Sequence, residues 1–243
     1  EFVLIPTNIN PAKDQYYAVK KQVKRASLVA TVAGDGTTLD CLIIVTRKTI
    51  EKELNFLGYR PSNGFHYVSQ TNSFMTQDIW DYWADTILFP SIIERRQKYQ
   101  YSGFVVLLID GCSAHFSDYF QEECHYYGII VFVEPPNSSD QLQVLDIGLF
   151  GIQKKAIKKV HPRKDLNEQT QQIIKIINAW KMASMPSNII SAFEQAGFSK
   201  YESCDQMCMK VDINNAVRVR GLLTTPVVHG DEYKKRIEIP YFE

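Results

Sequence analysis

Two short apolar segments, separated by about one helix length of chain, constrain the fold most. The first, FVVLLI at residues 104–109, ends in Asp110, and the second, GIIVFVEPP, occupies residues 128–136. A helical pattern over residues 116–127 lies between them. A strand, helix, strand order predicts a parallel pair of strands joined by a crossover helix. Because both strands are continuously apolar, we expect both faces of their sheet to be covered.

An antiparallel hairpin is predicted upstream. The run SLVATVAGDGTTLDCLIIV, residues 27–45, holds two β-rich segments around the turn residues Gly34, Asp35, Gly36 and Thr37. An Asp-Gly pair between such segments is a strong hairpin signal. FHYVSQ, residues 65–70, is predicted as a short edge strand. Together the segments indicate an α/β fold with a mixed sheet flanked by helices, and no glycine-rich phosphate loop of the GxGxxG or GxxxxGK[ST] type supports nucleotide binding.

Helices are predicted around this sheet. Apolar residues recur at helical spacing after Thr76, which is placed as a cap, and Pro90 is expected to interrupt this helix before it restarts over residues 91–97. A lysine-bearing helix is expected to begin near Leu145 after a loop, NSSDQLQ. Two more helices are expected over residues 167–198. We therefore predict a core at residues 1–160 and a helical extension packed on it at residues 161–243.

Composition limits the class of protein only weakly. The 243 residues hold 27 Lys and Arg against 27 Asp and Glu, so overall charge does not indicate a partner. The 5 cysteines form no CxxC pair, and no apolar run approaches 18 residues, so we expect a reducing compartment and no membrane partner. Since the chain begins with EFVLIP and no methionine, we expect it to be part of a longer protein.

Two aspartates are the candidate catalytic residues. Asp110 follows a buried strand at its carboxyl end, where open α/β sheets hold their chemistry. Asp146, in QLQVLDIGLF, lies 36 positions later, beyond the next strand, and is flanked by apolar residues. In a parallel sheet two such positions reach the same edge and can converge. The alternatives are a strand-end turn residue for Asp110 and a helix N-terminal acid for Asp146.

Convergent carboxylates indicate a divalent metal ion. Like charges repel unless a cation lies between them, and hard ions such as Mg²⁺ accept oxygen ligands. A pair of such ions can activate an attacking water and stabilise the leaving oxygen of a phosphodiester. Asp110 and Asp146 beside a lysine-rich helix therefore indicate phosphoryl transfer on nucleic acid.

Five further residues are candidates for supporting roles. His115 is expected to position Asp110 or to contact a phosphate, and its alternative is a structural histidine. Ser139 is expected in the loop before Asp146, with turn chemistry as the favoured role. Lys154, Lys155 and Lys158 form one basic helix face, which indicates phosphate contacts, with a solvated surface as the alternative.

These motifs together resemble a known family. LLIDGCSAH followed by FVEPPNSSDQLQVLDIGLFGIQKK resembles the catalytic core of DDE superfamily transposases of the pogo and Tigger type, relatives of mariner elements. The first motif matches at Asp110, Ser113 and His115. The second matches at the following residues: Pro136, Asn137, Ser139, Gln143, Leu145, Asp146, Gly148, Phe150 and Lys154. The hairpin and the segment SNIISAFEQAGF extend the likeness over most of residues 27–198.

The resemblance implies an RNase H-like fold and an enzyme. Asp110 and Asp146 would be the second and third acids of a triad that binds Mg²⁺ or Mn²⁺ for DNA strand cleavage and transfer in recombination. It also implies double-stranded DNA, at element ends and target, as the substrate rather than a small molecule, with a nuclear location and a homodimer.

The sequence departs from the family pattern at three positions. Val144 replaces a proline, and Gly111 and Cys112 replace the more usual asparagine and histidine. The first acid of the triad is expected upstream of the hairpin, before Glu1, so the core would lack its first strand. The alternative is a domesticated, catalytically inactive DNA or chromatin-binding module with the same fold.

Overall fold

The protein has a mixed α/β fold. A computed structural model describes residues 26–135, 138–161, 165–200 and 209–211. The first sheet has the order β1-β2-β3, from Ala26–Val29, Cys41–Val45 and Phe65–Ser69. β1 and β2 pair antiparallel, which confirms the predicted hairpin, and Gly36 in its turn has a positive φ of 85°. β3 pairs parallel to β2 and forms the edge that the sequence predicted.

The helix after Thr76 differs from the prediction at Pro90. α2 spans Gln77–Trp83, and the Thr76 side chain accepts a hydrogen bond from the Ile79 N–H, as expected for a cap. A π-helical turn, Ala84–Leu88, connects α2 directly to α3, Phe89–Tyr99. The expected interruption is therefore wrong. Proline has no N–H and its ring crowds the preceding turn, and a widened turn tolerates both without ending the helix.

The second pair of strands is parallel, as predicted, but the described helices do not cover both of its faces. β4 spans Val105–Ile109 and pairs with β5, Ile129–Val133, and α4, Asp118–Tyr126, crosses between them. Val106 is 59% exposed and Phe132 is 46% exposed. Full coverage is therefore not found among the described residues, because apolar composition does not reveal how many helical layers reach a strand.

The segment after β5 is more helical than predicted. Part of the expected loop NSSDQLQ forms a short helix, α5, at Ser139–Leu142, because Ser138 and Ser139 carbonyls accept bonds from the amides three and four residues ahead. The lysine-bearing helix begins as a π-helical turn, Leu145–Leu149, and continues as α6, Phe150–Ile157. Asn167 caps α7, Glu168–Ala183, and α8 spans Pro186–Gln195, so the two predicted helices are confirmed.

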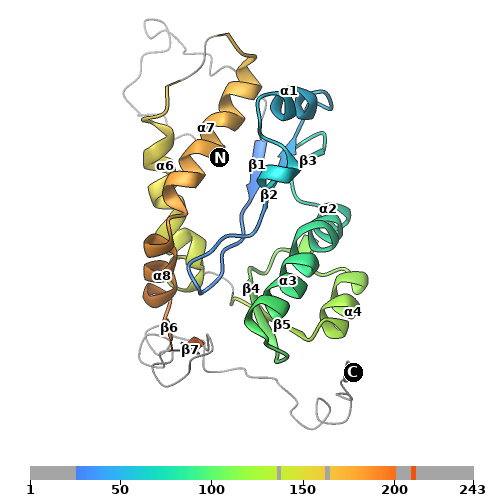
Figure 1. The fold of residues 1–243 in the computed structure, drawn as a ribbon, viewed down its shortest axis with the longest axis vertical. Helices are drawn as coiled ribbons and strands as arrows, with labels where there is room; N and C mark the ends of the chain where they lie inside the picture. Colours follow the sequence, from blue (N-terminus) through green and yellow to red (C-terminus); the bar gives the residue numbers. More distant parts are fainter. Residues whose placement is uncertain (1–25, 136–137, 162–164, 201–208, 212–243) are drawn as a thin grey trace, which may run out of the picture.

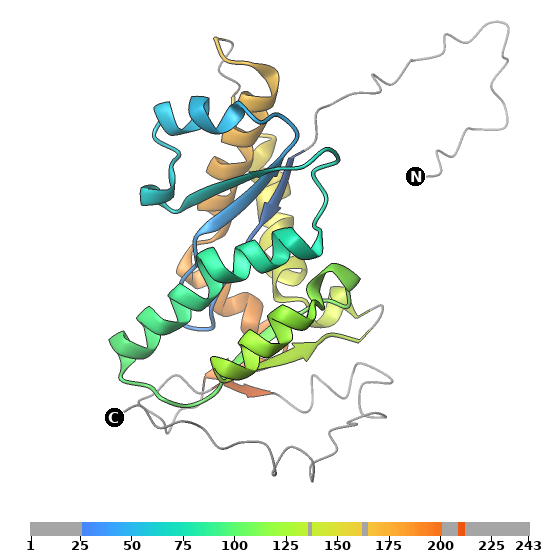
Figure 2. The same ribbon diagram turned by 90° about the vertical axis from the view of Figure 1, so that its right-hand side faces the viewer.

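Strand β2 is the centre of the molecule because helices cover both of its faces. All five of its residues are buried. Leu42 and Ile44 face the layer of α2, α3 and α4, whereas Ile43 and Val45 face the layer of α7 and α8. Figure 1 shows the strands between these two helical layers, and Figure 2 views the molecule from the side of α2, α3 and α4.

The described strands form separate sheets rather than the single mixed sheet that was predicted. Within the residues the structure describes, β1 pairs only with β2, and β4 pairs only with β5. Each therefore has one edge without a backbone partner among those residues. The sheets still share a core, since Leu42 and Ile44 pack in the same cluster as Ile109 and Ile129.

The predicted division at residue 160 remains a prediction, although one hydrophobic cluster spans it. Ile173, Ile177 and Ile189 share their buried contacts with Ile43. No helix in the described part of the chain is long and apolar enough to cross a membrane. The remaining short elements are α1 Ile50–Phe56, a 3₁₀ turn Pro61–Asn63, a 3₁₀ turn Ser113–His115, β6 Phe198–Lys200 and β7 Met209–Val211.

Gly148 fixes the position of the π-helical turn that carries Asp146. A Cβ atom at Gly148 would lie 2.4 Å from Cβ and 3.1 Å from Cα of Ala192 on α8. The Cα atom of Ala192 is part of the backbone of α8, so it cannot move away unless α8 itself moves. A Cβ at Gly151, three residues later, would meet nothing within 4 Å.

We expect Gly148→Ala to lower the free energy of unfolding by about 1–3 kcal/mol, because the added methyl group overlaps α8. Gly151→Ala is the matched control and should raise stability by about 0.5–1 kcal/mol through its higher helix propensity. Urea denaturation of both variants measures this. Equal effects of the two substitutions would show that the turn and α8 are not in close contact.

Candidate active site

Asp110 lies at the carboxyl end of β4, held by its own turn. The Cys112 N–H donates a hydrogen bond of 3.0 Å to Oδ1 of Asp110. Nδ1 of His115 lies 2.9 Å from the same oxygen, although the N–H direction is poorly aligned for a hydrogen bond. The Asp110 side chain is 43% exposed. Both contacts fall on Oδ1, so Oδ2 is the oxygen left to face a ligand.

His115 is a largely buried histidine that packs beside Asp110. Its ring stacks on Trp80 with the ring centroids 3.9 Å apart, and its side chain is 12% exposed. Burial lowers the pKa of His115 below its ordinary value, and the neighbouring Asp110 charge only partly offsets this. The imidazole is therefore neutral at pH 7. The predicted proximity to Asp110 is present, while the proposed supporting role remains a prediction.

Asp146 lies in the π-helical turn that follows α5. The carbonyl of Gln143 accepts hydrogen bonds from the Asp146 and Ile147 amides, both at 3.0 Å. Asp146 is exposed, whereas Leu149 in the same turn is fully buried. The apolar neighbours that made Asp146 look out of place in the sequence thus anchor the turn, and they leave the carboxylate directed away from the core.

A third carboxyl group, Glu134, joins these two and was missed from the sequence. It follows β5, and its N–H donates a 2.8 Å hydrogen bond to the Ile109 carbonyl. Its side chain is 6% exposed, and Oε2 has no hydrogen-bond partner in the described part of the chain. Burial raises the pKa of Glu134 to about 7, and the charges of Asp110 and Asp146 add to this rise. Asp110 and Asp146 thus each act electrostatically on Glu134.

The three acids suit a hard divalent cation by their chemistry, but the described residues whose donor atoms come within metal-binding distance of one another include neither Glu134 nor Asp146. Carboxylate oxygens are the ligands that Mg²⁺ and Mn²⁺ prefer. Among the described residues, no lysine or arginine forms an ion pair with any of the three acids. The donor atoms of Asp110, Cys112 and His115 also lie within 4.8 Å of one another, which adds a sulfur and a nitrogen suited to softer metals.

The predicted DNA-contacting lysines are exposed on one side of α6. Lys154 and Lys155 lie on the helix and Lys158 at its C-cap, while Gln153 and Ala156 are buried on the opposite side, against α7. Ser139 is exposed at the first residue of α5, and in the described structure no hydrogen bond joins it to Asp146. Its supporting role therefore remains a prediction, and no hydrogen bond to Asp146 in the described structure supports it.

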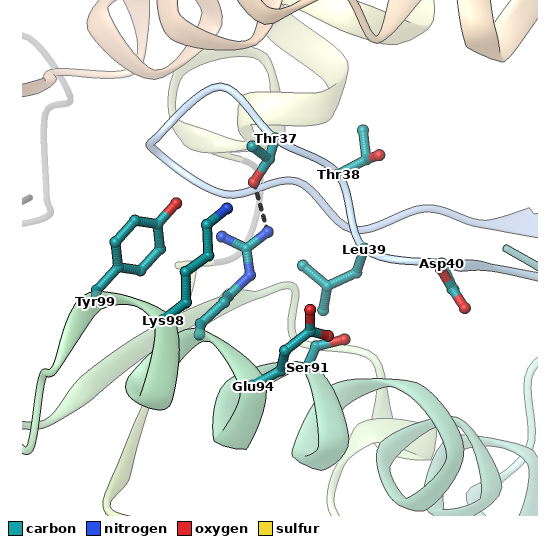
Figure 3. A pocket seen from close by; sticks show the side chains of 9 residues that line it. Thr37, Thr38, Leu39, Asp40, Ser91, Glu94, Lys98 and Tyr99 are labelled. Atoms are coloured by element: carbon teal, nitrogen blue, oxygen red, sulfur yellow. Dashed lines mark hydrogen bonds between the residues drawn. The ribbon is translucent and has the colours of Figure 1, made fainter.

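A pocket between the hairpin and α3 is a less suitable candidate. Figure 3 shows Thr37 and Leu39 on the hairpin facing Glu94, Lys98 and Tyr99 on α3. Arg95, which lines this pocket, is already paired with Asp35. Asp35, in the hairpin turn beside it, accepts bonds from Arg95 at 2.8 Å, from Tyr99 at 3.2 Å and from the Thr37 amide at 2.9 Å. This network ties the hairpin to α3, so Asp35 is not an available third acid.

In metal-free protein, Glu134→Gln should stabilise the fold in a pH-dependent manner. Between pH 4.5 and about 7 the folded chain retains a proton on Glu134 that the unfolded chain has released, so stability is lost as the pH rises through this range. The gain from glutamine should therefore be about 3 kcal/mol larger at pH 8 than at pH 4.

Denaturation in the presence of a chelator measures this difference. Glu122→Gln, at an exposed position of α4, is the control for removing a surface carboxylate. A Glu134→Gln gain that stays constant from pH 4 to pH 8 would contradict the raised pKa.

Comparison with known proteins identifies a family for most of the chain. The family model described as DDE superfamily endonuclease matches residues 23–196, which include Asp110, Glu134 and Asp146. Neither the curated proteins nor the solved structures gave a match. The resemblance drawn from the sequence motifs is therefore confirmed at the level of the superfamily.

Proposed function

Because this chain belongs to the DDE superfamily of endonucleases, we propose that it is the catalytic core of a transposase, or of a protein derived from one. It acts on DNA by strand cleavage and strand transfer, and its relatives are elements of the pogo and Tigger type. One observation carries the proposal. The family match over residues 23–196 includes both Asp110, at the carboxyl end of β4, and Asp146, in the turn that leads into α6.

In the proposed site, Asp110 and Asp146 hold Mg²⁺ or Mn²⁺. When bound, such ions activate the attacking water or 3′ hydroxyl and stabilise the leaving oxygen. The contacts of Cys112 and His115 to Oδ1 hold the Asp110 carboxylate in one orientation. Asp146 is held by its turn, which is anchored through Leu149 and Gly148. The chain thus supplies preoriented oxygens, which lowers the cost of ordering the site.

We also propose an RNase H-like arrangement of the strands. β1 and β4 each have one edge without a partner among the described residues. A further strand paired with both edges would join the two sheets into one mixed sheet, with the hairpin on one side and the parallel pair on the other. That strand would carry the first acid of the triad, in keeping with the family pattern.

The proposed partner is double-stranded DNA, at element ends and at a target. The exposed lysines of α6 follow the turn that carries Asp146, so a phosphate backbone in contact with them passes close to the acids. A nuclear location and a homodimer are part of the same proposal, because the substrate is chromosomal DNA and two element ends are processed together.

Substituting either aspartate should abolish metal-dependent cleavage. We expect a protein that contains this chain together with the first acid of the triad to nick supercoiled plasmid DNA with Mn²⁺ and not with a chelator. Asp110→Asn and Asp146→Asn should each lower the rate by about a hundredfold or more, because a metal ligand is removed. Asp40→Asn is the matched control, since Asp40 pairs with His66 beside β2. Nicking that survives Asp110→Asn would refute the proposed role of this aspartate.

Replacing Lys154, Lys155 and Lys158 with glutamine should weaken DNA binding at every sequence. For each phosphate that a lysine no longer neutralises, the slope of log affinity against log salt should become shallower by about 0.9. Lys48→Gln and Lys52→Gln, exposed near α1, are controls that should leave the slope unchanged. An unchanged slope in the triple variant would show that these lysines form a solvated surface and do not contact phosphates. Salt-sensitive binding by the wild type without any cleavage would favour the inactive DNA-binding module.

A further inference from the structure

We infer that Asp110, Cys112 and His115 form a binding site for a divalent metal ion of intermediate softness, such as Zn²⁺. The three residues belong to one segment, the end of β4 and the 3₁₀ turn Ser113–His115 that follows it. They offer an oxygen, a sulfur and a nitrogen. Zn²⁺ binds all three kinds of ligand, whereas Mg²⁺ favours only the oxygen.

The three ligand atoms are already close enough to share one ion. One donor atom from each side chain lies within 4.8 Å of the other two. In a tetrahedral zinc site, neighbouring ligand atoms are about 3.4–3.6 Å apart, given metal–ligand bonds of about 2.0–2.3 Å. Nδ1 of His115 lies 2.9 Å from Oδ1 of Asp110, so this pair must open by about 0.5 Å to admit the ion. The Asp110 side chain is 43% exposed and has room for that movement.

Backbone hydrogen bonds hold the three positions together. The Cys112 N–H donates to Oδ1 of Asp110 at 3.0 Å, and the His115 N–H donates to the Cys112 carbonyl at 2.9 Å. These bonds fold the segment into a turn, so residues two and three positions apart present their side chains to one place. Because the turn exists before any ion binds, less conformational freedom is lost on binding.

His115 presents a nitrogen that no hydrogen bond occupies. Nδ1 is buried, and it has no hydrogen-bond partner in the described part of the chain. A buried polar atom without a partner calls for an explanation, such as an ion. Stacking on Trp80, with the ring centroids 3.9 Å apart, fixes the plane of the imidazole. His115 is therefore the rigid ligand of the site.

Cys112 is the ligand that gives the site its preference for a softer metal. Of the three cysteines in the described residues, Cys41 and Cys124 are buried and Cys112 is exposed. Its thiol releases a proton to the buffer when it coordinates the ion. The exposure of Cys112 and Asp110 also leaves the outer side open, so a water molecule can complete a four-coordinate ion. The alternative is a hard ion bound by Asp110, with the thiol and the imidazole as bystanders.

Within the proposed function, zinc at this site would be inhibitory. Asp110 is there a ligand of Mg²⁺ or Mn²⁺, and a zinc ion held by the thiolate and the imidazole engages the same carboxylate. This consequence rests on the proposed function, whereas the zinc site itself rests only on the contacts of the turn.

Co²⁺, a coloured substitute for Zn²⁺, tests the site in the 243-residue chain. Cys204 and Cys208 lie outside the described residues, so both are first replaced with serine to remove their thiols. This parent should show a thiolate-to-cobalt charge-transfer band that added Zn²⁺ removes. Cys112→Ser, at an exposed position, should abolish the band and lower the affinity for Zn²⁺ by about a hundredfold or more. Ser113→Ala, in the same turn, is the matched control and should leave both unchanged.

The outcomes separate the zinc site from the proposed function. A parent without the band, or a band and a Zn²⁺ affinity that survive Cys112→Ser, would overturn the site. Zn²⁺ should also inhibit Mn²⁺-dependent nicking by a protein that includes the first acid, and Cys112→Ser should reduce this inhibition relative to its own zinc-free rate. Equal inhibition of both would overturn the inhibitory consequence. A band that depends on Cys112, in a protein that never nicks DNA, would overturn the proposed function and support the zinc site.

Discussion

The parallel pairing of β4 with β5 is the constraint on which the candidate site depends. Parallel strands end at the same edge, so the chain leaves both strands at one place. This brings Asp110 beside Glu134 through the hydrogen bond at Ile109. The chain then runs through α5 into the π-helical turn that carries Asp146. Without the parallel register, Asp110 and Glu134 would not lie at adjacent strand ends.

Electrostatics makes this arrangement unfavourable unless something compensates it. Burial of Glu134 raises its pKa to about 7, and the charges of Asp110 and Asp146 add to this rise. The folded state keeps this unfavourable arrangement of charges because packing elsewhere in the structure holds the acids in place. Gly148 packs against Ala192 and Leu149 is buried, which fixes the turn of Asp146, while His115 is held by its stacking on Trp80.

Local patterns predicted most elements correctly, and their failures share one cause. The hairpin, the parallel pair, the cap at Thr76 and the helices α7 and α8 all follow from short-range rules. The expected interruption at Pro90 and the loop before Asp146 were wrong, and full coverage of β4 and β5 is not found among the described residues. Each of these depends on what packs nearby, such as a widened turn or the number of helical layers, and composition does not contain that information.

The sequence by itself determined the order of elements, the two aspartates at strand and helix boundaries and their likeness to the DDE superfamily; their convergence stays a prediction. Glu134 carried a readable signal, since VVLLID and IIVFVE are both five apolar residues followed by an acid. Only the tertiary structure decided that these two runs pair in register and that the Glu134 oxygen is buried without a partner. The physical reason is that register and desolvation arise from contacts between distant segments, which residue spacing along the chain does not specify.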